Sequence, residues 1–575
     1  MRGFPYAQMF IISCIRFAEP IAFTSLFPYV YFMIKDFGIA KTKSEIATYS
    51  GYLSASFAFC QFLCCVHWGR FSDQVGRKYV LLFGLFGTSV SMLMFGFAPN
   101  FYWAMFARSL MGVLNGNIAV LRTTIGEIAT ERRHQATAFS TLPLLWNLGS
   151  IVGPMIGGSP YLTRPKSYND DHQDMNVVLK FFTMSTKTVN GPQIYEDFIT
   201  KYPYALSNVV VSFLIWFSLI MGFLFLEETH PKYKDRRDRG LEIGDWILAR
   251  FGVVKTRPWK KITTQDDGDS SSTHSTATEH SSLLNPRPLY ASVVDDDYDL
   301  EDDVSIQSVG PYSRRLSMAL IRRYSSNKLH EVSSVTTTET IQGFNSRVFT
   351  PQVRQTVLAN FFTAFHTIVY SEFLPVFLAG DLQPKELEFP FKIAGGFGYS
   401  SSTIGTLLSS TGLIGVLGIM FVFPYLDRNF KTISTYRASS TIFPFIYFLL
   451  PYLIFTLHEY NPAFPTWFAK LILYVFCCLN AFASAIGFPN ILILIHRASP
   501  AKHRAFINGS ALSLSSLARF MGPIIWGYIM SFSGSHKVGW LSWSILSLLA
   551  VVCSIQAFCM EDYDLELEEE AISDE

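Results

Sequence analysis

The sequence predicts an all-α polytopic membrane protein with twelve transmembrane helices in two related bundles of six. Three observations predict this class. Hydrophobic residues make up 49% of the 575 positions, and charged residues make up 16%, well below the roughly 25% of soluble domains. Apolar runs of about 20 residues, the length that a helix needs to cross a bilayer, recur along the chain. One long polar stretch divides these runs into two blocks of six.

Each apolar run defines one predicted span. The spans of the first block cover residues 9–33, 45–68, 79–98, 102–126, 137–160 and 205–227, and those of the second cover residues 354–379, 403–425, 437–457, 467–495, 507–531 and 538–559. The first run has no small-residue cleavage site, so we interpret it as a retained span rather than a signal peptide. All eight cysteines fall within apolar runs without metal-site spacing, which favours a packing role.

The polar stretch sets the domain organisation. We expect an N-terminal six-helix bundle over residues 1–229, a linker over 230–352, a C-terminal six-helix bundle over 353–560 and an acidic tail over 561–575. The linker contains SSSTHSTATEHSS and DDDYDLEDD, which are too polar to bury a core. We therefore expect it to be largely disordered.

The distribution of Lys and Arg predicts the orientation. The segments GRFSDQVGRK, ERRHQ, KYKDRRDR, LDRNFK and HRASPAKHR all fall in gaps on one side of the predicted spans. By the positive-inside tendency that side is cytosolic. With twelve spans, both termini and the central loop are then cytosolic too.

The two blocks also resemble each other. GRFSDQVGRK after the second span is echoed by FPYLDRNFK after the eighth, which aligns Asp73 with Asp427. VGPMIGG in the fifth span is echoed by MGPIIWG in the eleventh, which aligns Pro154 with Pro523. Parallel six-span repeats are a transporter construction with the substrate site near the midplane.

Three motifs resemble those of the major facilitator superfamily, in its twelve-span drug:proton antiporter branch. The loop motif comprises Gly69, Asp73, Gly76, Arg77 and Lys78; the arginine motif is Arg108-Ser-Leu-Met-Gly112; the antiporter motif comprises Gly149, Gly153, Pro154, Gly157 and Gly158. AEPIAFTSLFPY and the long central insert are most similar to fungal vacuolar members and plant zinc-induced facilitators. The central loop has only three histidines, His274, His280 and His330, which disfavours a metal substrate.

Gly149, Gly153 and Gly157 of the antiporter motif lie on one helix face at a spacing of four, which permits close approach of a neighbouring backbone. Pro154 bends the helix, which a bundle tolerates. The resemblance implies a bend that prevents proton leak and favours exchange; a structural crossing without a coupling role is the alternative.

The loop motif is expected to form a tight turn at Gly69 and Gly76. Asp73 can cap the next helix or pair with an arginine of the other half. The resemblance implies a gating latch that includes Arg122 and Glu127, whereas a basic turn that only sets topology is the alternative. The second-half counterpart lacks the glycines, which favours a one-sided latch.

Ionisable residues within spans are costly and normally face a wet cavity. Arg16 and Glu19 lie three residues apart in the first span, and Arg108 lies in the fourth. His366 and Glu372 lie about 120° apart on the seventh and need not share a cavity. We predict Glu19 as the proton carrier, Glu372 as the second choice and Arg108 as the charge partner. A permanent structural Arg16–Glu19 bridge is the alternative.

The central loop carries two signals for traffic and regulation. Glu279, Leu283 and Leu284 fit an acidic dileucine sorting signal, which an adaptor protein would bind. Ser317 and Ser325 each follow paired arginines, as basic-directed kinases prefer, and phosphorylation would add negative charge there. A merely solvated linker is the alternative.

These observations favour a proton-coupled antiporter, acting as a monomer, that moves a small organic solute or drug out of the cytosol. The expected location is the vacuolar membrane, with the plasma membrane as second choice. A uniporter or symporter, and a non-transporting sensor or scaffold that uses the long loop, are the alternatives. No phosphate-binding glycine loop, metal-ligand cluster or catalytic constellation is recognisable. We therefore expect no enzyme activity, cofactor, metal or nucleic-acid partner.

Overall fold

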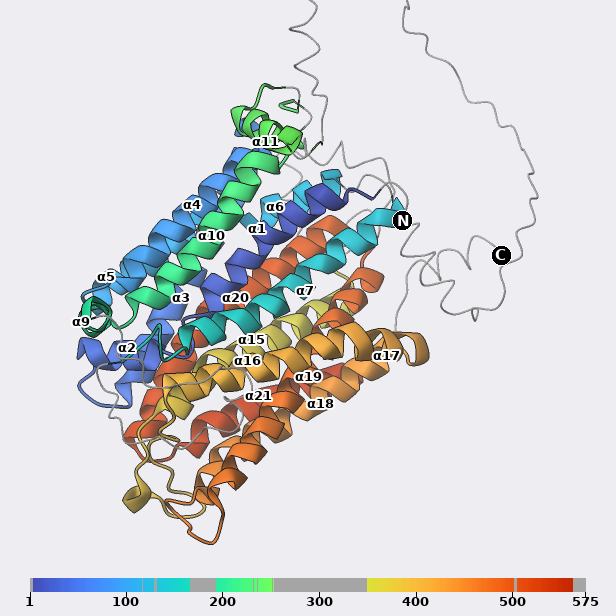
Figure 1. Ribbon diagram of the computed structural model, residues 1–575. Helices are drawn as coiled ribbons and strands as arrows, with labels where there is room; N and C mark the ends of the chain where they lie inside the picture. The colour runs from blue at the N-terminus through green and yellow to red at the C-terminus, as the bar shows by residue number, and fades with distance from the viewer. Residues whose placement is uncertain are drawn as a thin grey trace, which may run out of the picture.

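A computed structural model describes residues 4–115, 117–128, 132–165, 193–230, 232–234, 236–250, 252, 349–500 and 504–561. Long helices run alongside one another in two groups, one blue to green and one yellow to red (Figure 1). We call the end that carries residues 69–78 the proximal face. The end that carries residues 35–43 is the distal face. The sequence predicts that the proximal face is cytosolic.

The first half contains the six predicted spans as single or broken helices. Their bounds are α1 (Tyr6–Thr24), α2 (Val30–Phe37), α3 (Glu45–Val75), α4 (Arg77–Gly96), α5 (Phe101–Leu114), α6 (Asn117–Ile128), α7 (Arg132–Gly157) and α10 (Ala205–Phe225). The first span is broken between α1 and α2, where Pro28 lies, because proline cannot donate the next helical hydrogen bond. The fourth span is broken between α5 and α6. The short helix α9 (Gln193–Lys201) precedes α10.

The second half repeats this arrangement. Its bounds are α15 (Pro351–Ala379), η3 (Pro384–Glu386), α16 (Ser401–Leu417), η4 (Gly418–Val422), α17 (Phe423–Asn429), α18 (Thr432–Leu449), η5 (Leu450–Thr456), α19 (Thr466–Ala498), α20 (Arg504–Ser535) and α21 (Trp540–Cys559). Thr350 caps α15, with Pro351 in its first turn, and Ser400 caps α16 through its side chain.

Eight helices of the described part of the chain are long and apolar enough to cross a bilayer, and α3 makes nine when its two segments are counted as one bent span. The remaining predicted spans correspond to the broken α5–α6 pair, to α7 and to α20. The apolar part of α7 is only Leu144–Gly157. The helices thus occupy the twelve predicted positions, although not all satisfy a length criterion individually.

Buried apolar side chains of the described residues form three clusters. The largest combines both halves, including Val30 and Ile34 of α2 with Phe373 and Phe377 of α15. A second cluster belongs to the first half alone and a third to the second half alone. The third contains Val353, at the proximal start of α15. The halves therefore share a core toward the distal face and have separate cores toward the proximal face.

The linker begins later than the sequence predicts. Helix α11 (Arg239–Arg250) lies within the stretch assigned to a largely disordered linker, and it packs on the proximal end of α10 (Figure 1). Gly240 and Gly244 lie against the carbonyl groups of Phe223 and Leu224. The polar composition concealed this helix because its apolar contacts are few and its anchors are polar.

Candidate functional site

The antiporter motif brings α7 against α1. Side chains added at Gly149, Gly153 and Gly157 would collide with α1 between Pro20 and Ser25. The Thr24 hydroxyl donates to the Gly149 carbonyl over 3.3 Å. It also donates to the Pro20 carbonyl of its own helix. This face of α7 therefore packs within the first half.

The fourth motif glycine has a different neighbour. Gly158 lies against Gly405 of α16, and a side chain on Gly405 would collide with the carbonyl oxygen of Pro154. The same contact recurs between α3 and α20, where Gly51 lies against the carbonyl oxygen of Pro523. Pro154 and Pro523 are the two prolines that the internal repeat aligns. The halves thus meet through two related contacts between a glycine and a proline carbonyl.

Polar contacts also join the halves at the distal face. The carboxylate of Asp381, just after α15, lies 3.0 Å from the ammonium of Lys35 and 2.6 Å from that of Lys43. Burial acts to raise the pKa of the Asp381 carboxyl, but Lys43 and Lys35 outweigh burial and hold that pKa below its ordinary value. Sequence reasoning did not identify this bridge, because its partners are about 340 positions apart.

The predicted carrier Glu19 lies in a fully occupied environment. Its carboxylate forms an ion pair with Arg16, and the side-chain amide of Asn115 donates to its other oxygen over 3.4 Å. The Arg16 guanidinium lies 5.3 Å from the ring centroid of Trp146 in α7. Arg519 of α20 lies 5.8 Å from the same centroid. Trp146 therefore links charged residues of both halves by cation–π contacts.

Arg108 and Glu372 lie at the boundary between the halves. Arg108 is 1% exposed, and its guanidinium lies 4.9 Å from the ring centroid of Phe57. Two of its nitrogen atoms have no hydrogen-bond partner among the described residues. Glu372 of α15 is 6% exposed and is within electrostatic range of Arg108, with the Ser54 hydroxyl within hydrogen-bonding reach. One of its carboxyl oxygens also lacks a described partner.

His366 does not share these neighbours. Its Nδ1 atom lies 3.0 Å from the Tyr447 hydroxyl, and its ring centroid lies 4.8 Å from that of Phe443. Both partners belong to α18. His366 is thus enclosed within the second half, whereas Glu372, six residues later, faces Ser54 of the first half.

The loop motif turns at Gly76 alone. Gly76 has a φ of +115°, which favours glycine, and an added side chain would collide with the Glu228 carboxylate. That carboxylate accepts hydrogen bonds from the backbone amides of Arg77 and Lys78, at 2.9 and 3.1 Å. Glu228 rather than Asp73 therefore caps α4. The expectation of a turn at Gly69 is wrong, because Gly69 lies inside α3 with nothing near its missing side chain.

Charges of the loop motif are paired within the first half. Arg77 bridges Asp73 at 2.6 Å and Glu127 at 3.3 Å. The ammonium of Lys78 lies 2.7 Å from the carboxylate of Asp238, which precedes α11. In this conformation Asp73 thus pairs with an arginine of its own loop. The Arg122 side chain lies outside the described residues.

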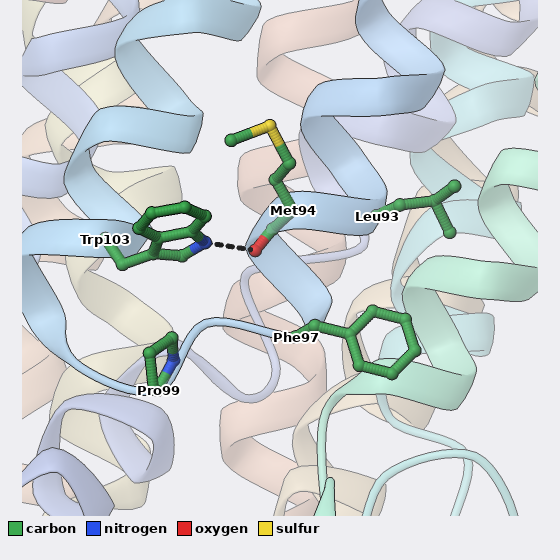
Figure 2. A pocket seen from close by; sticks show the side chains of 5 residues that line it. All are labelled: Leu93, Met94, Phe97, Pro99 and Trp103. Atoms are coloured by element: carbon green, nitrogen blue, oxygen red, sulfur yellow. Dashed lines mark hydrogen bonds between the residues drawn. The ribbon is translucent and has the colours of Figure 1, made fainter.

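A hollow of about 430 Å³ opens at the distal ends of α4 and α5. Figure 2 shows its lining, which comprises Leu93, Met94, Phe97, Pro99 and Trp103. The Trp103 indole donates to the Met94 carbonyl over 3.2 Å. No predicted site residue lines this hollow. Its apolar walls suit lipid chains better than a charged solute.

Several predicted sites lie outside the described residues. These are the sorting signal at Glu279, Leu283 and Leu284 and the phosphorylation sites Ser317 and Ser325. Among the residues that the structure describes, no group of three or more His, Cys, Asp or Glu side chains could hold a metal ion.

The chain is similar to known transporters over nearly its whole length. A relative from Aspergillus fumigatus, named a major facilitator superfamily multidrug transporter (mfsB), is 33% identical over 97% of this chain and 84% of its own. The Arabidopsis thaliana protein Zinc Induced Facilitator 1 is 23% identical over 96% of this chain and 90% of its own. A solved bacterial homologue of the human lysosomal transporter Spinster, at 12% identity, superposes with a TM-score of 0.54 and covers 97% of each chain.

The sequence pattern of one family covers both halves. It matches residues 12–266 and 356–565, which include the loop, arginine and antiporter motifs and all twelve helical positions. The protein is therefore an integral multi-pass membrane transporter that belongs to the Major Facilitator Superfamily.

Proposed function

We propose that this transporter is a proton-coupled antiporter that exports a small organic solute or drug from the cytosol, and that Glu372 carries the proton. The observation that carries this proposal is the burial of Glu372 opposite Arg108, with open hydrogen-bonding positions on both side chains. Removing one partner of a buried charge pair costs about 3–5 kcal/mol. Such groups are retained where they exchange a proton or bind a solute.

Glu372 is better suited to this role than Glu19. The Glu19 carboxylate has partners for both oxygens, because Arg16 and Asn115 bind them within the first half. Its charge is therefore stabilised whether or not the halves move. Glu372 instead interacts with Ser54 and Arg108 of the opposite half, in addition to the charge of Arg519 in its own half. Rocking of the two halves would change that environment and so would change the affinity for a proton.

The arrangement of the cores supports alternating access. The halves are joined at the distal face by Asp381 with Lys35 and Lys43 and by the two glycine–proline contacts. Their separate proximal cores support a state that receives solute from the proximal side. A return to this state after distal release would complete one exchange cycle.

The solute class is inferred from the names of relatives. Besides the fungal multidrug transporter, these include an efflux pump of Aspergillus niger and a tetracycline resistance protein of Pasteurella multocida. We propose that this chain likewise exports apolar or aromatic drugs. The vacuolar membrane stays the favoured location and the plasma membrane the second.

Proteoliposomes with an imposed pH gradient test the coupling, with radiolabelled tetracycline as the first probe and other drugs in parallel. We expect gradient-driven uptake by the parent protein. Glu372→Gln should abolish net uptake but retain exchange of labelled for unlabelled drug, because exchange needs no net proton transfer. Glu19→Gln is the matched variant and should retain part of the gradient response. Uptake that does not depend on the pH gradient would refute the mechanism and would favour a uniporter. Full coupling of uptake to the gradient in Glu372→Gln would also refute it.

A further inference from the structure

Helix α11 presents an exposed apolar face that the transport cycle does not explain. Trp246 is 63% exposed and Ile243 is 48% exposed, at a spacing that puts them on one side of the helix. The Arg250 guanidinium lies 5.5 Å from the Trp246 ring centroid. The opposite side of α11, including Leu241 and Gly244, is buried. The helix is therefore amphipathic, with large apolar side chains on its outer face.

The orientation of α11 is fixed by its anchors. Asp238 accepts a hydrogen bond from the Gly240 amide over 2.8 Å and binds Lys78 through its other oxygen. Both side chains of that ion pair are buried, at 1% and 9% exposure. Gly240 and Gly244 allow the helix to contact the last turn of α10 directly. Residues on the outer face of α11 consequently keep a constant position relative to the membrane-spanning helices.

That position adjoins the exposed apolar surface of α10. Helix α10 exposes a stripe of large apolar residues that recur every three or four positions, as a lipid-facing helix does: Phe213, Phe217, Ile220 and Phe223. The stripe ends at Phe223, whose carbonyl contacts Gly240. Helix α11 thus begins where the lipid-facing surface of α10 ends (Figure 1).

The segment that leads into α11 is strongly basic. Its exposed cationic residues are Lys232, Lys234, Arg236, Arg237 and Arg239. Three acidic groups among the described residues of this segment and α11 are engaged or buried: Asp238 binds Lys78, Glu242 binds Arg237 at 2.7 Å, and Asp245 is buried. A net positive surface beside exposed apolar side chains matches an anionic membrane surface.

We propose that α11 and the preceding basic segment bind anionic phospholipids of the proximal leaflet, with Trp246 and Ile243 inserted at the level of the acyl-chain boundary. Two independent features support a lipid surface as the occupant: the continuity with the stripe on α10 and the charge of residues 232–239. Lipid bound here would contact α11. The residue before this helix, Asp238, forms the ion pair with Lys78 of the loop motif. The inference does not depend on proton coupling.

Quenching by brominated lipids tests this proposal. The full-length protein is reconstituted in phosphatidylcholine vesicles that contain either brominated phosphatidylserine or brominated phosphatidylcholine in equal proportion. The fluorescence of Trp246 is obtained as the difference in tryptophan fluorescence between the parent protein and Trp246→Phe. We expect brominated phosphatidylserine to quench Trp246 severalfold more than brominated phosphatidylcholine, because basic residues near the surface attract anionic lipid. A variant with Gln at positions 232, 234, 236 and 239 should lose this preference but retain quenching by either lipid.

Trp103 is the matched control, because its indole is 45% exposed at the distal face, away from this basic segment. The difference signal from Trp103→Phe should show quenching without preference for phosphatidylserine. Equal quenching of Trp246 by the two lipids would overturn the role of the charges. Absence of quenching by either lipid would show that protein or water covers the α11 face, and would overturn the proposal. Transport assays are not needed for either outcome, so failure of the antiport mechanism remains distinguishable.

Discussion

The carbonyl oxygen of Pro154 occupies the space that a side chain on Gly405 would need. The internal repeat reproduces this relationship, with the carbonyl of Pro523 beside Gly51. Each contact joins one half to the other, so the glycines serve the distal closure. This geometry assigns Gly51 and Gly405 a role that no motif in the sequence gave them.

Gly405→Ala should weaken the closed distal face. The added methyl must displace the Pro154 backbone or separate the halves, and we expect separation because the proposed cycle opens this interface. We expect faster labelling of a cysteine introduced at Ser401, which is buried beside Gly158. Labelling is read by peptide mass spectrometry to distinguish the native cysteines.

Gly415→Ala on the same helix is the control, because its methyl would meet Ala481 at an ordinary contact distance of 3.7 Å. Equal labelling of the two variants would contradict a role for the Pro154 contact in closure.

Arg108→Gln should destabilise the protein, and a second substitution should restore part of the loss. Without Arg108 the buried Glu372 carboxyl loses one of its two compensating charges and keeps only that of Arg519. Arg108→Gln combined with Glu372→Gln should therefore melt at a higher temperature than Arg108→Gln alone. Melting temperatures in detergent measure the effect.

Arg437→Gln provides the comparison, because among the described residues Arg437 donates to the carbonyls of Ala557, Phe558 and Met560 and to no carboxylate. Its effect should simply add to that of Glu372→Gln. Additive effects for Arg108 as well would indicate that the two groups do not interact.

Local patterns gave the correct arrangement where the relevant partners are close in sequence. The spacing of Gly149, Gly153 and Gly157 predicts one helix face, and that face contacts α1. The choice of Glu19 over Glu372 rested on Arg16, which is visible three residues away. The groups that act on Glu372 are Ser54, Arg108 and Arg519, which only tertiary packing brings near.

The same limit explains the interpretation of the loop motif. Two glycines in GRFSDQVGRK suggest two turn positions, but α3 continues through Gly69 as far as Val75. The cap of α4 comes from Glu228, about 150 positions later. Composition also hid α11, since its attachment depends on one ion pair and two glycine contacts. Such contacts leave no periodic pattern.

Asp381→Asn should favour opening of the distal face. The mutation removes the charge that holds Lys35 and Lys43 of the other half. We expect faster labelling of the Ser401→Cys reporter. Glu388→Gln is the matched control, because Glu388 pairs with Lys392 four residues away on the same face. Its removal should leave labelling unchanged; an equal increase would indicate a nonspecific charge effect.

The pH dependence of this bridge follows from the direction of the pKa shift. The pKa of Asp381 is lowered in the closed state, and an unperturbed aspartate titrates at about 3.9. The bridge therefore stabilises closure fully above that pH and is lost as pH falls through the lower pKa. Labelling of the Ser401→Cys reporter, divided by the labelling rate of a free thiol at the same pH because only the thiolate reacts, should stay constant between neutral pH and about pH 5 when Asp381 is intact. If labelling instead increased between neutral pH and about pH 5, and Asp381→Asn abolished that increase, the lowered pKa of Asp381 would be contradicted.

Gly76→Ala should impair the protein far more than Gly69→Ala. Alanine at position 76 must adopt a φ of +115° and displace the Glu228 carboxylate that caps α4. Strain at such a position costs of order 1–3 kcal/mol, and a lost helix cap adds about 1 kcal/mol. At position 69 alanine should be neutral or stabilising, because the site is helical and open. Melting temperature and the yield of monodisperse protein measure both effects. In this conformation only Gly76 of the two has a backbone that requires glycine. If Gly69→Ala proved as harmful as Gly76→Ala, Gly69 would therefore be needed for a conformational change rather than for this fold.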